Sequence, residues 1–186
     1  MRIVIGGEDE TALRLAEALM GDHEVALLCP EQSRSTRLDR MDVEAVYGPL
    51  TATGLLRRAG AAEADLFVAA SSVDESNLVA CVNARHLGAR RTICFLTRLD
   101  VQAPKEDRQL LAESLRIDQV VVPAEQLAEE ILRIVAIPGA LDVGVFLDGQ
   151  VHLLRHAVEE GAPLCRTALR DAGLPPGVVL VMTRRG

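Results

Sequence analysis

A short segment rich in glycine and acidic residues follows the first apolar run of the chain, and it is a natural place for a nucleotide phosphate. The segment reads Gly6-Gly7-Glu8-Asp9-Glu10-Thr11. A turn between a strand and a helix binds phosphate through free backbone amides, and its usual fingerprint is G-x-G-x-x-G. Only the first glycine of that fingerprint is in place, because Glu8 and Thr11 occupy the second and third glycine positions.

The three acids of this segment allow two interpretations. Carboxylates at the start of a helix are stabilised by the helix dipole and can cap its free amides. The same charges would repel a pyrophosphate. We favour a helix start capped by acidic residues over a phosphate loop, and both interpretations stay open at this stage.

The end of the second apolar run carries the next candidate. A dinucleotide fold places an Asp or Glu there to bind the ribose hydroxyls. This chain has Cys29 at that point, followed by Pro30 and Glu31. A thiol cannot replace a carboxylate as a hydrogen-bond acceptor, so Glu31 is the candidate substitute for the ribose contact.

Hydroxyl side chains follow the fourth apolar run, where Ser71 and Ser72 precede the acids Asp74 and Glu75. Serines just before a helix usually cap it, and this is the interpretation we favour. They are also placed to bond a ligand at the edge of the sheet. We assign the two acids to the helix start rather than to acid–base catalysis.

Metal binding and catalysis have weaker support in the sequence. His152 and His156 fall on the same face of a predicted strand. No third ligand is apparent, whereas metal sites need three or four. We therefore expect no metal site, and the spacing indicates no Ser–His–Asp arrangement.

The elements that must position these residues are built with very few aromatic side chains. The chain has 186 residues, of which 49% are hydrophobic and 2% aromatic, with a net charge of −7. Low aromatic content argues against base-stacking modules, and the acidic charge argues against nucleic acid or anionic membrane as a partner. The four widely spaced cysteines favour a reducing compartment. With no apolar run of about 18 residues, we expect a cytoplasmic protein.

Short β-branched runs alternate with longer amphipathic stretches over the first 135 residues or so. This alternation predicts an α/β fold, a doubly wound parallel sheet with helices on both faces. The predicted strands are Ile3–Ile5, Glu24–Leu28, Val43–Tyr47, Leu66–Ala70, Thr92–Leu96 and Gln119–Val122. The predicted helices are Thr11–Leu19, Gln32–Met41, Ala52–Ala59, Asp74–Leu87, Glu106–Leu115 and Ala124–Val135.

The pattern changes at Ile137-Pro138-Gly139, which predicts a domain of residues 1–136 and a second one of residues 137–186. The second part is predicted to be a small, incomplete α+β subdomain, too short to bury a core alone. Its predicted elements are strands at Val143–Leu147 and Val151–His156 joined by an Asp-Gly turn, a helix at Pro163–Ala172 and a strand at Val178–Thr183.

Four stretches of the chain resemble the N-terminal half of the TrkA potassium-uptake proteins, which are also described as RCK or KTN domains. They are A-G-x-x-x-A-D-L-x-V-A at Ala59–Ala69, S-S-x-D-E-S-N-L-V-A-C at Ser71–Cys81, V-x-P-A-E-Q-L-A-E-E-I at Val121–Ile131 and I-P-G-A-L-D-V-x-x-F-x-D-G-x-V at Ile137–Val151. The last stretch resembles the opening of the family's C-terminal ligand subdomain. The resemblance therefore implies that this subdomain continues beyond Gly186.

The resemblance implies a Rossmann-fold domain that binds NAD(H) or another adenine nucleotide. Its site residues would be the phosphate loop from Gly6 to Glu10, a ribose contact at Cys29, strand-four contacts at Ser71 and Ser72, and a phosphate contact at Phe95, where the family has an arginine. Only Gly6 and the serines match the family pattern, so we expect weak or no NAD binding through the first turn. Arg98, three residues after Phe95, is a candidate replacement cation.

The function that follows from the resemblance is regulation rather than catalysis. It implies a cytosolic regulatory subunit, peripheral to the inner face of the cell membrane, that forms a dimer or larger ring and gates a potassium-translocating membrane subunit. The alternatives are a degenerate domain without nucleotide that acts only in assembly, and an NAD-dependent enzyme. The enzyme has the least support, because no catalytic acid, base or substrate domain is visible.

Overall fold

The structure of the protein is a computed structural model that describes residues 1–31, 38–98, 104–136, 140–146, 151–168, 171 and 173–184. The chain forms two compact units, Met1–Ala128 and Glu129–Gly186. The dividing point lies inside helix α5, Pro123–Ala136. The domain boundary that the sequence predicts, between residues 136 and 137, stays a prediction.

The first unit is built on one six-stranded sheet in which every pair of neighbouring strands is parallel. The order of the strands across the sheet is β3-β2-β1-β4-β5-β6. Their bounds are β1 Arg2–Gly6, β2 Glu24–Cys29, β3 Glu44–Tyr47, β4 Leu66–Ala69, β5 Thr92–Phe95 and β6 Gln119–Val121. The predicted Rossmann-like parallel sheet is confirmed.

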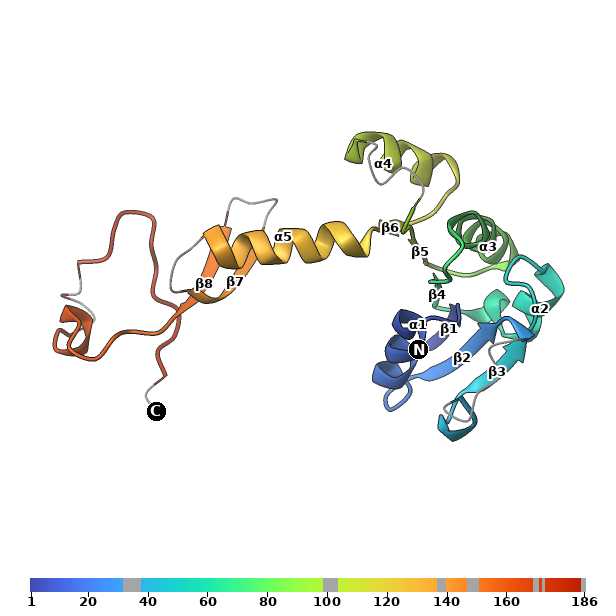
Figure 1. The fold of residues 1–186 in the computed structure, drawn as a ribbon, viewed down its shortest axis with the longest axis horizontal. Helices are drawn as coiled ribbons and strands as arrows, with labels where there is room; N and C mark the ends of the chain where they lie inside the picture. The colour runs from blue at the N-terminus through green and yellow to red at the C-terminus, as the bar shows by residue number, and fades with distance from the viewer. Residues whose placement is uncertain are drawn as a thin grey trace. The chain divides into compact units, whose positions relative to one another are not determined.

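Helices connect these strands and cover both faces of the sheet (Figure 1). Their bounds are α1 Glu10–Leu19, α2 Thr53–Arg58, α3 Asp74–Leu87 and α4 Lys105–Ser114, with short 3-10 turns at Leu38–Arg40 and Ala61–Glu63. Most of the helix predicted at Gln32–Met41 lies outside the described residues, and its described end is the first of these short turns.

Two apolar layers hold the sheet between the helices. Ile3 and Ile5 of β1 pack on the side of α1, with Ala12 and Ala16 of that helix. Val4, the residue between them, packs in the other layer, which holds side chains of α2, α3 and α4. Side chains that alternate between two buried layers are expected for a parallel sheet covered on both faces.

The second unit holds an antiparallel hairpin of β7, Ala140–Phe146, and β8, Val151–His156. The hairpin confirms the two strands predicted there. Of the helix predicted at Pro163–Ala172, the structure has a 3-10 turn at Pro163–Cys165 and no α-helix over residues 166–168, whereas residues 169, 170 and 172 lie outside the described residues. The strand predicted at Val178–Thr183 is wrong.

The error at Val178–Thr183 has a physical reason. An extended segment becomes a strand only when a neighbouring strand satisfies its backbone groups. No described strand pairs with this segment, and Val179, Val181 and Met182 are all largely exposed. A continuous run of β-branched and other apolar residues therefore did not suffice to define a strand here.

Candidate functional site

A crevice between two strands is the natural ligand position in this fold. The chain runs outward from β1 to β2 and β3 on one side, and from β4 to β5 and β6 on the other. The direction of winding therefore reverses between β1 and β4, and open parallel sheets bind ligands beyond the carboxyl ends of the strands at such a point. The β1–α1 turn and the segments after β2, β4 and β5 lie at this edge.

The β1–α1 turn needs glycine at position 7, whereas a side chain at Gly6, the last residue of β1, would meet only the flexible side chain of Leu50. A Cβ atom on Gly6 would lie 2.1 Å from Leu50 Cδ1, and one on Gly7 would lie 2.3 Å from the backbone oxygen of Ala70. Gly7 also has φ +154, a backbone conformation that residues other than glycine rarely adopt. The turn is thus packed directly against the segment that follows β4.

The side chains of Asp9 and Glu10 make contacts within the protein. Asp9 is the N-cap of α1, and its Oδ1 accepts a hydrogen bond of 3.0 Å from the backbone N–H of Ala12. This confirms the acid-capped helix start that we favoured. Glu10 lies in the first turn of α1 and pairs with Arg14 at 2.7 Å.

Thr11, at the third glycine position of the fingerprint, is exposed. Ala12 is fully buried instead, and its Cβ lies 3.1 Å from where a Gly7 Cβ would be. The close approach of helix and turn is therefore made by Ala12 rather than by Thr11.

The side chain of Glu8 reaches across to the segment after β4. Ser72 Oγ donates a 2.9 Å hydrogen bond to Glu8 Oε1. The second carboxylate oxygen, Oε2, is buried and has no hydrogen-bond partner among the described residues. The carboxylate thus links the two loops that flank the β1/β4 switch point.

Cys29 ends β2, as predicted, but its thiol faces inward. It is fully buried, and its Sγ donates to the backbone oxygen of Gly7 at 3.0 Å. Burial, with a further contribution from the negative charge of Glu8, raises the pKa of the Cys29 thiol to about 11. Glu31, the candidate substitute for the ribose contact, is exposed two residues further on.

Ser71 does not cap α3. The N-cap of this helix is Val73, which makes no side-chain cap hydrogen bond, so the cap predicted for the serines is wrong. Ser71 Oγ instead donates to Asn77 Oδ1 at 2.7 Å, and Asn77 Nδ2 donates to the backbone oxygens of Ser71 and Phe95, both at 2.9 Å. Phe95 is half-buried, and its side chain packs against the apolar layer on the α1 side.

A second buried polar group joins α3 to the segment after β5. Asp74 Oδ2 accepts hydrogen bonds from the backbone N–H groups of Thr97 and Arg98, at 2.9 and 2.6 Å. Sequence reasoning assigned Asp74 only to the helix start and missed Asn77, although an Asn inside a helix is unusual enough to raise the question of what its side chain bonds to. Together the two residues fix the segments after β4 and β5 to one helix.

Arg98 lies next to Ser72, as its proposed role requires. Both line a pocket of about 170 Å³. The pocket is also lined by Val73, Asp74 and Glu75, so two acidic residues share it with Arg98. Arg98 is therefore close to the crevice but in an acidic setting.

These residues allow a test of whether the crevice fits the diphosphate of NAD(H). The amide of Ala12 is taken by Asp9, and the Glu8 carboxylate lies across the crevice to Ser72. Like charges about 4 Å apart repel by about 1 kcal/mol in bulk water and about 4 kcal/mol at an effective dielectric of 20. The described side chains therefore do not fit a diphosphate at this turn.

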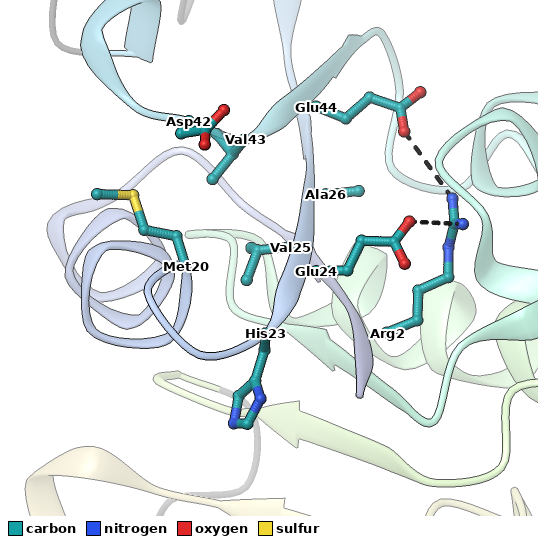
Figure 2. A pocket seen from close by; sticks show the side chains of 9 residues that line it. All are labelled: Arg2, Met20, His23, Glu24, Val25, Ala26, Asp42, Val43 and Glu44. Carbon is teal, nitrogen blue, oxygen red and sulfur yellow. Dashed lines mark hydrogen bonds and ion pairs between the residues drawn. The ribbon is translucent and has the colours of Figure 1, made fainter.

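The opposite edge of the sheet holds a larger cavity of about 290 Å³ at the amino ends of β1, β2 and β3. Figure 2 shows Arg2 reaching Glu24 and Glu44, with N–O distances of 2.8 and 3.9 Å. These contacts join the starts of three strands, so we assign them to the fold. Among the described residues, no group of three or more His, Cys, Asp or Glu could hold a metal ion.

A parallel sheet of this order, with a glycine turn after β1 and a crevice at the switch point, defines a Rossmann-like class of domain. The sequence profile of the TrkA-N domain family matches residues 3–123, and the chain belongs to this family. The resemblance found in the sequence motifs is thereby confirmed.

Relatives and solved structures support this assignment. The chain is 35% identical over 187 residues to a Trk system potassium uptake protein TrkA homolog of Archaeoglobus fulgidus, covering 100% of this chain and 42% of that protein. The TrkA-N domain of the inner membrane protein ybaL from Escherichia coli has a similar fold, with TM-score 0.59 and 17% identity over 72% of this chain and 95% of that one.

A third similar structure is the GsuK channel bound to NAD, with TM-score 0.56 and 21% identity over 79% of this chain and 25% of that one. The chain spans about two fifths of the length of the curated relatives that it matches. Among the described residues, no helix combines the length and the apolar content needed to cross a bilayer.

Proposed function

We propose that this chain is part of a cytoplasmic regulatory component of a potassium-uptake system. The observation that carries the proposal is the similarity to a Trk potassium uptake protein over the whole chain, including the part beyond the Rossmann-like domain. The partner would be a potassium-translocating membrane subunit, with the regulatory chains forming a dimer or larger ring at the inner face of the membrane.

The mechanism would be a shift between arrangements of the assembled domains. A ligand or partner that binds one arrangement more tightly than another changes their populations, and the membrane subunit responds to that change. Asp74 and Asn77 support this mechanism, because they tie the segments at the crevice to α3. A change at the crevice would thereby reach a whole helix.

The experiment that tests this function is an uptake assay in the native host. Deleting the gene should lower the initial rate of rubidium or potassium uptake, and the full-length protein supplied in trans should restore it. A strain that expresses the protein without residues 1–136 serves as the control for the role of this domain. Uptake that is unchanged by deletion of the gene would contradict the proposal.

A second candidate is an assembly domain of the same shape that binds no nucleotide. The hydrogen bond between Glu8 and Ser72 favours this candidate, because it holds the Glu8 side chain across the crevice. A thermal-shift panel of NAD, NADH, ATP, ADP and a cyclic dinucleotide separates the two candidates. A ligand at 100 times its Kd stabilises a protein by about 2.7 kcal/mol, so true binding would be visible. An NAD-dependent enzyme has the least support, since the relatives are named as uptake proteins.

A further inference from the structure

The amino edge of the six-stranded sheet divides into an acidic half and a basic half. Exposed carboxylates lie at the starts of β2 and β3, and exposed arginines lie at the starts of β5 and β6. The order of the strands is β3-β2-β1-β4-β5-β6, so the two halves lie on either side of a centre between β1 and β4. The edge is therefore polarised along its length.

The basic half holds arginines that the chain does not pair. Helices α3 and α4 pack in the same apolar layer, so both run back to this edge of the sheet. Arg91 directly precedes β5, Arg116 follows α4, and both are exposed. Neither side chain makes an ion pair or hydrogen bond with the described part of the chain, whereas Arg85 pairs with Asp118 at 3.3 Å. Two guanidinium groups thus stay free for carboxylates from outside.

The acidic half surrounds the cavity of about 290 Å³ at the starts of β2 and β3. Glu24 and Glu44 line this cavity and share the single cation Arg2, and their side chains are 67% and 58% exposed (Figure 2). Asp42 also lines it, and Asp22 lies just before β2. Both aspartates are exposed and lack side-chain partners among the described residues. Carboxylates therefore exceed cations in this half.

The cavity suits the side chain of an arginine. Met20, Val25 and Val43 give it an apolar wall, on which the methylene groups of an arginine can pack. The acids of the same cavity can bind the guanidinium, whose planar fork matches a carboxylate. The acidic half is therefore complementary to the basic half in charge and in the kind of side chain that it accepts.

We propose that the amino edge is a self-complementary docking surface for a second copy of this chain. A two-fold axis through the centre of the edge places the start of β6 opposite the start of β3 of the other copy, and β5 opposite β2. Arg116 of each copy then meets Asp42 of the other, and Arg91 meets Asp22. Every contact occurs twice, as in any two-fold interface. The inference rests on the proposed function in that it names a surface through which the regulatory chains assemble.

Reversal of charge tests this surface. Arg91→Glu with Arg116→Glu reverses the basic half, and Asp22→Arg with Asp42→Arg reverses the acidic half. Either double variant alone places like charges opposite each other twice, so the dissociation constant of its self-association should rise at least about 10-fold. An equal mixture of the two double variants has opposite charges at both contacts again. It should associate within about 3-fold of the unreversed protein, as measured by sedimentation equilibrium.

Two precautions isolate the edge from other effects. Every protein is measured with and without Ile131→Glu, because Ile131 is an exposed apolar side chain of α5 and a separate possible source of association. Arg14→Glu with Arg98→Glu is the matched control, since it makes the same change of net charge on exposed arginines away from the amino edge. This control should keep the dissociation constant within about 2-fold. Circular dichroism spectra confirm that each variant is folded.

A mixture that associates no better than the separate double variants overturns the proposal. An effect confined to one half overturns it as well, because a two-fold contact uses both halves equally. The same holds for a control as weak as the reversed proteins, or for a protein with Ile131→Glu that is monomeric at every concentration. Potassium uptake in the gene-deletion strain is measured separately, so failure of this surface and failure of the proposed function give different results.

Discussion

Asn77 satisfies four hydrogen-bonding groups from inside the protein. Its Oδ1 accepts from the backbone N–H and the hydroxyl of Ser71, and its Nδ2 donates to the carbonyls of Ser71 and Phe95. The side chain is fully buried. One residue of α3 thereby holds together the carboxyl ends of β4 and β5.

Replacing Asn77 should therefore destabilise the domain strongly. Asn77→Ala leaves buried backbone groups without partners, and we expect the free energy of unfolding to fall by about 2–4 kcal/mol. Urea denaturation followed by circular dichroism measures this loss. Asn83→Ala is the matched control on the same helix, because Asn83 Nδ2 donates a hydrogen bond to the backbone oxygen of Thr51 and the residue is only half-buried. A loss as large in the control would contradict the role given to Asn77.

The Cys29 thiol predicts a loss of stability at alkaline pH. Its pKa is about 11 in the folded protein, whereas an unfolded thiol titrates near 8.5, so the unfolded chain releases its proton first. Between these values the unfolded state binds fewer protons, and stability falls as the pH rises. Cys29→Ser keeps a donor to Gly7 and does not titrate in this range.

We expect the stability of the unmodified protein relative to Cys29→Ser to fall by about 2 kcal/mol between pH 8 and pH 10.5. Urea denaturation at a series of pH values measures the difference, and the titration of other groups is common to both proteins. A difference that stays constant with pH would show that the thiol is not held neutral by the fold.

At the residue scale, the sequence identified most side chains of the crevice but not their partners. Gly6, Ser72 and Arg98 lie at the carboxyl edge of the sheet, and their predicted role in binding a ligand stays a prediction. The hydrogen bond between Glu8 and Ser72 joins residues that are 64 positions apart. Local patterns of charge and spacing carry no information about such a contact, since it exists only after β1 and β4 pair.

At the scale of elements, the β1–α1 turn is the most tightly constrained connection of the site. Gly7 has φ +154, and a Cβ there would lie 2.3 Å from Ala70 O, which is backbone and cannot rotate away. The N–H of Gly7 donates to the backbone oxygen of Leu28 at 3.0 Å. The turn is therefore fixed to both neighbouring strands.

Gly7→Ala should destabilise the domain by about 3 kcal/mol or more, because the new methyl group forces the turn away from the backbone after β4. Thermal denaturation measures the change. Gly54→Ala is the matched control, since Gly54 lies in α2 and a Cβ there meets nothing within 4 Å. The control should be neutral or more stable by up to about 1 kcal/mol. A Gly7→Ala protein as stable as the control would contradict this account of the turn.

Periodicity predicted the elements of the first unit well, and α3 was predicted at its observed bounds, Asp74–Leu87. Strands buried on both faces, such as Leu66–Ala69, give continuous apolar runs that are easy to recognise. The predictions failed for the described part of Pro163–Ala172 and for Val178–Thr183. These segments have local patterns that suit a helix and a strand, but no described element pairs with them or buries them.

At the scale of the whole molecule, α5 carries apolar side chains that the described part of the chain leaves exposed to solvent. Leu127, Ile131, Leu132 and Val135 are all more than half exposed. Exposed apolar side chains that recur at helical spacing usually mark a surface that contacts another protein. This surface is therefore a candidate for the self-association that the family resemblance implies.

We therefore predict that the protein is at least a dimer in solution, with an interface that buries about 1,200 Å² or more in total. Ile131→Glu places a charge within this apolar surface, and we expect the dissociation constant of the oligomer to rise by at least about 10-fold. Light scattering over a range of concentrations measures the mass. The side chain is exposed within the chain, so the fold should survive, which circular dichroism checks.

Gln126→Glu is the matched control for that variant, because it adds the same charge to an exposed polar position of the same helix. If α5 forms the interface through its apolar side chains, this control should keep the oligomeric mass of the unmodified protein, whereas Ile131→Glu should shift it toward the monomer. Equal effects of the two variants would indicate that net charge, rather than burial of Ile131, controls association. A monomeric unmodified protein at every concentration would remove α5 as a self-association surface, and the ring mechanism would then lack its structural basis.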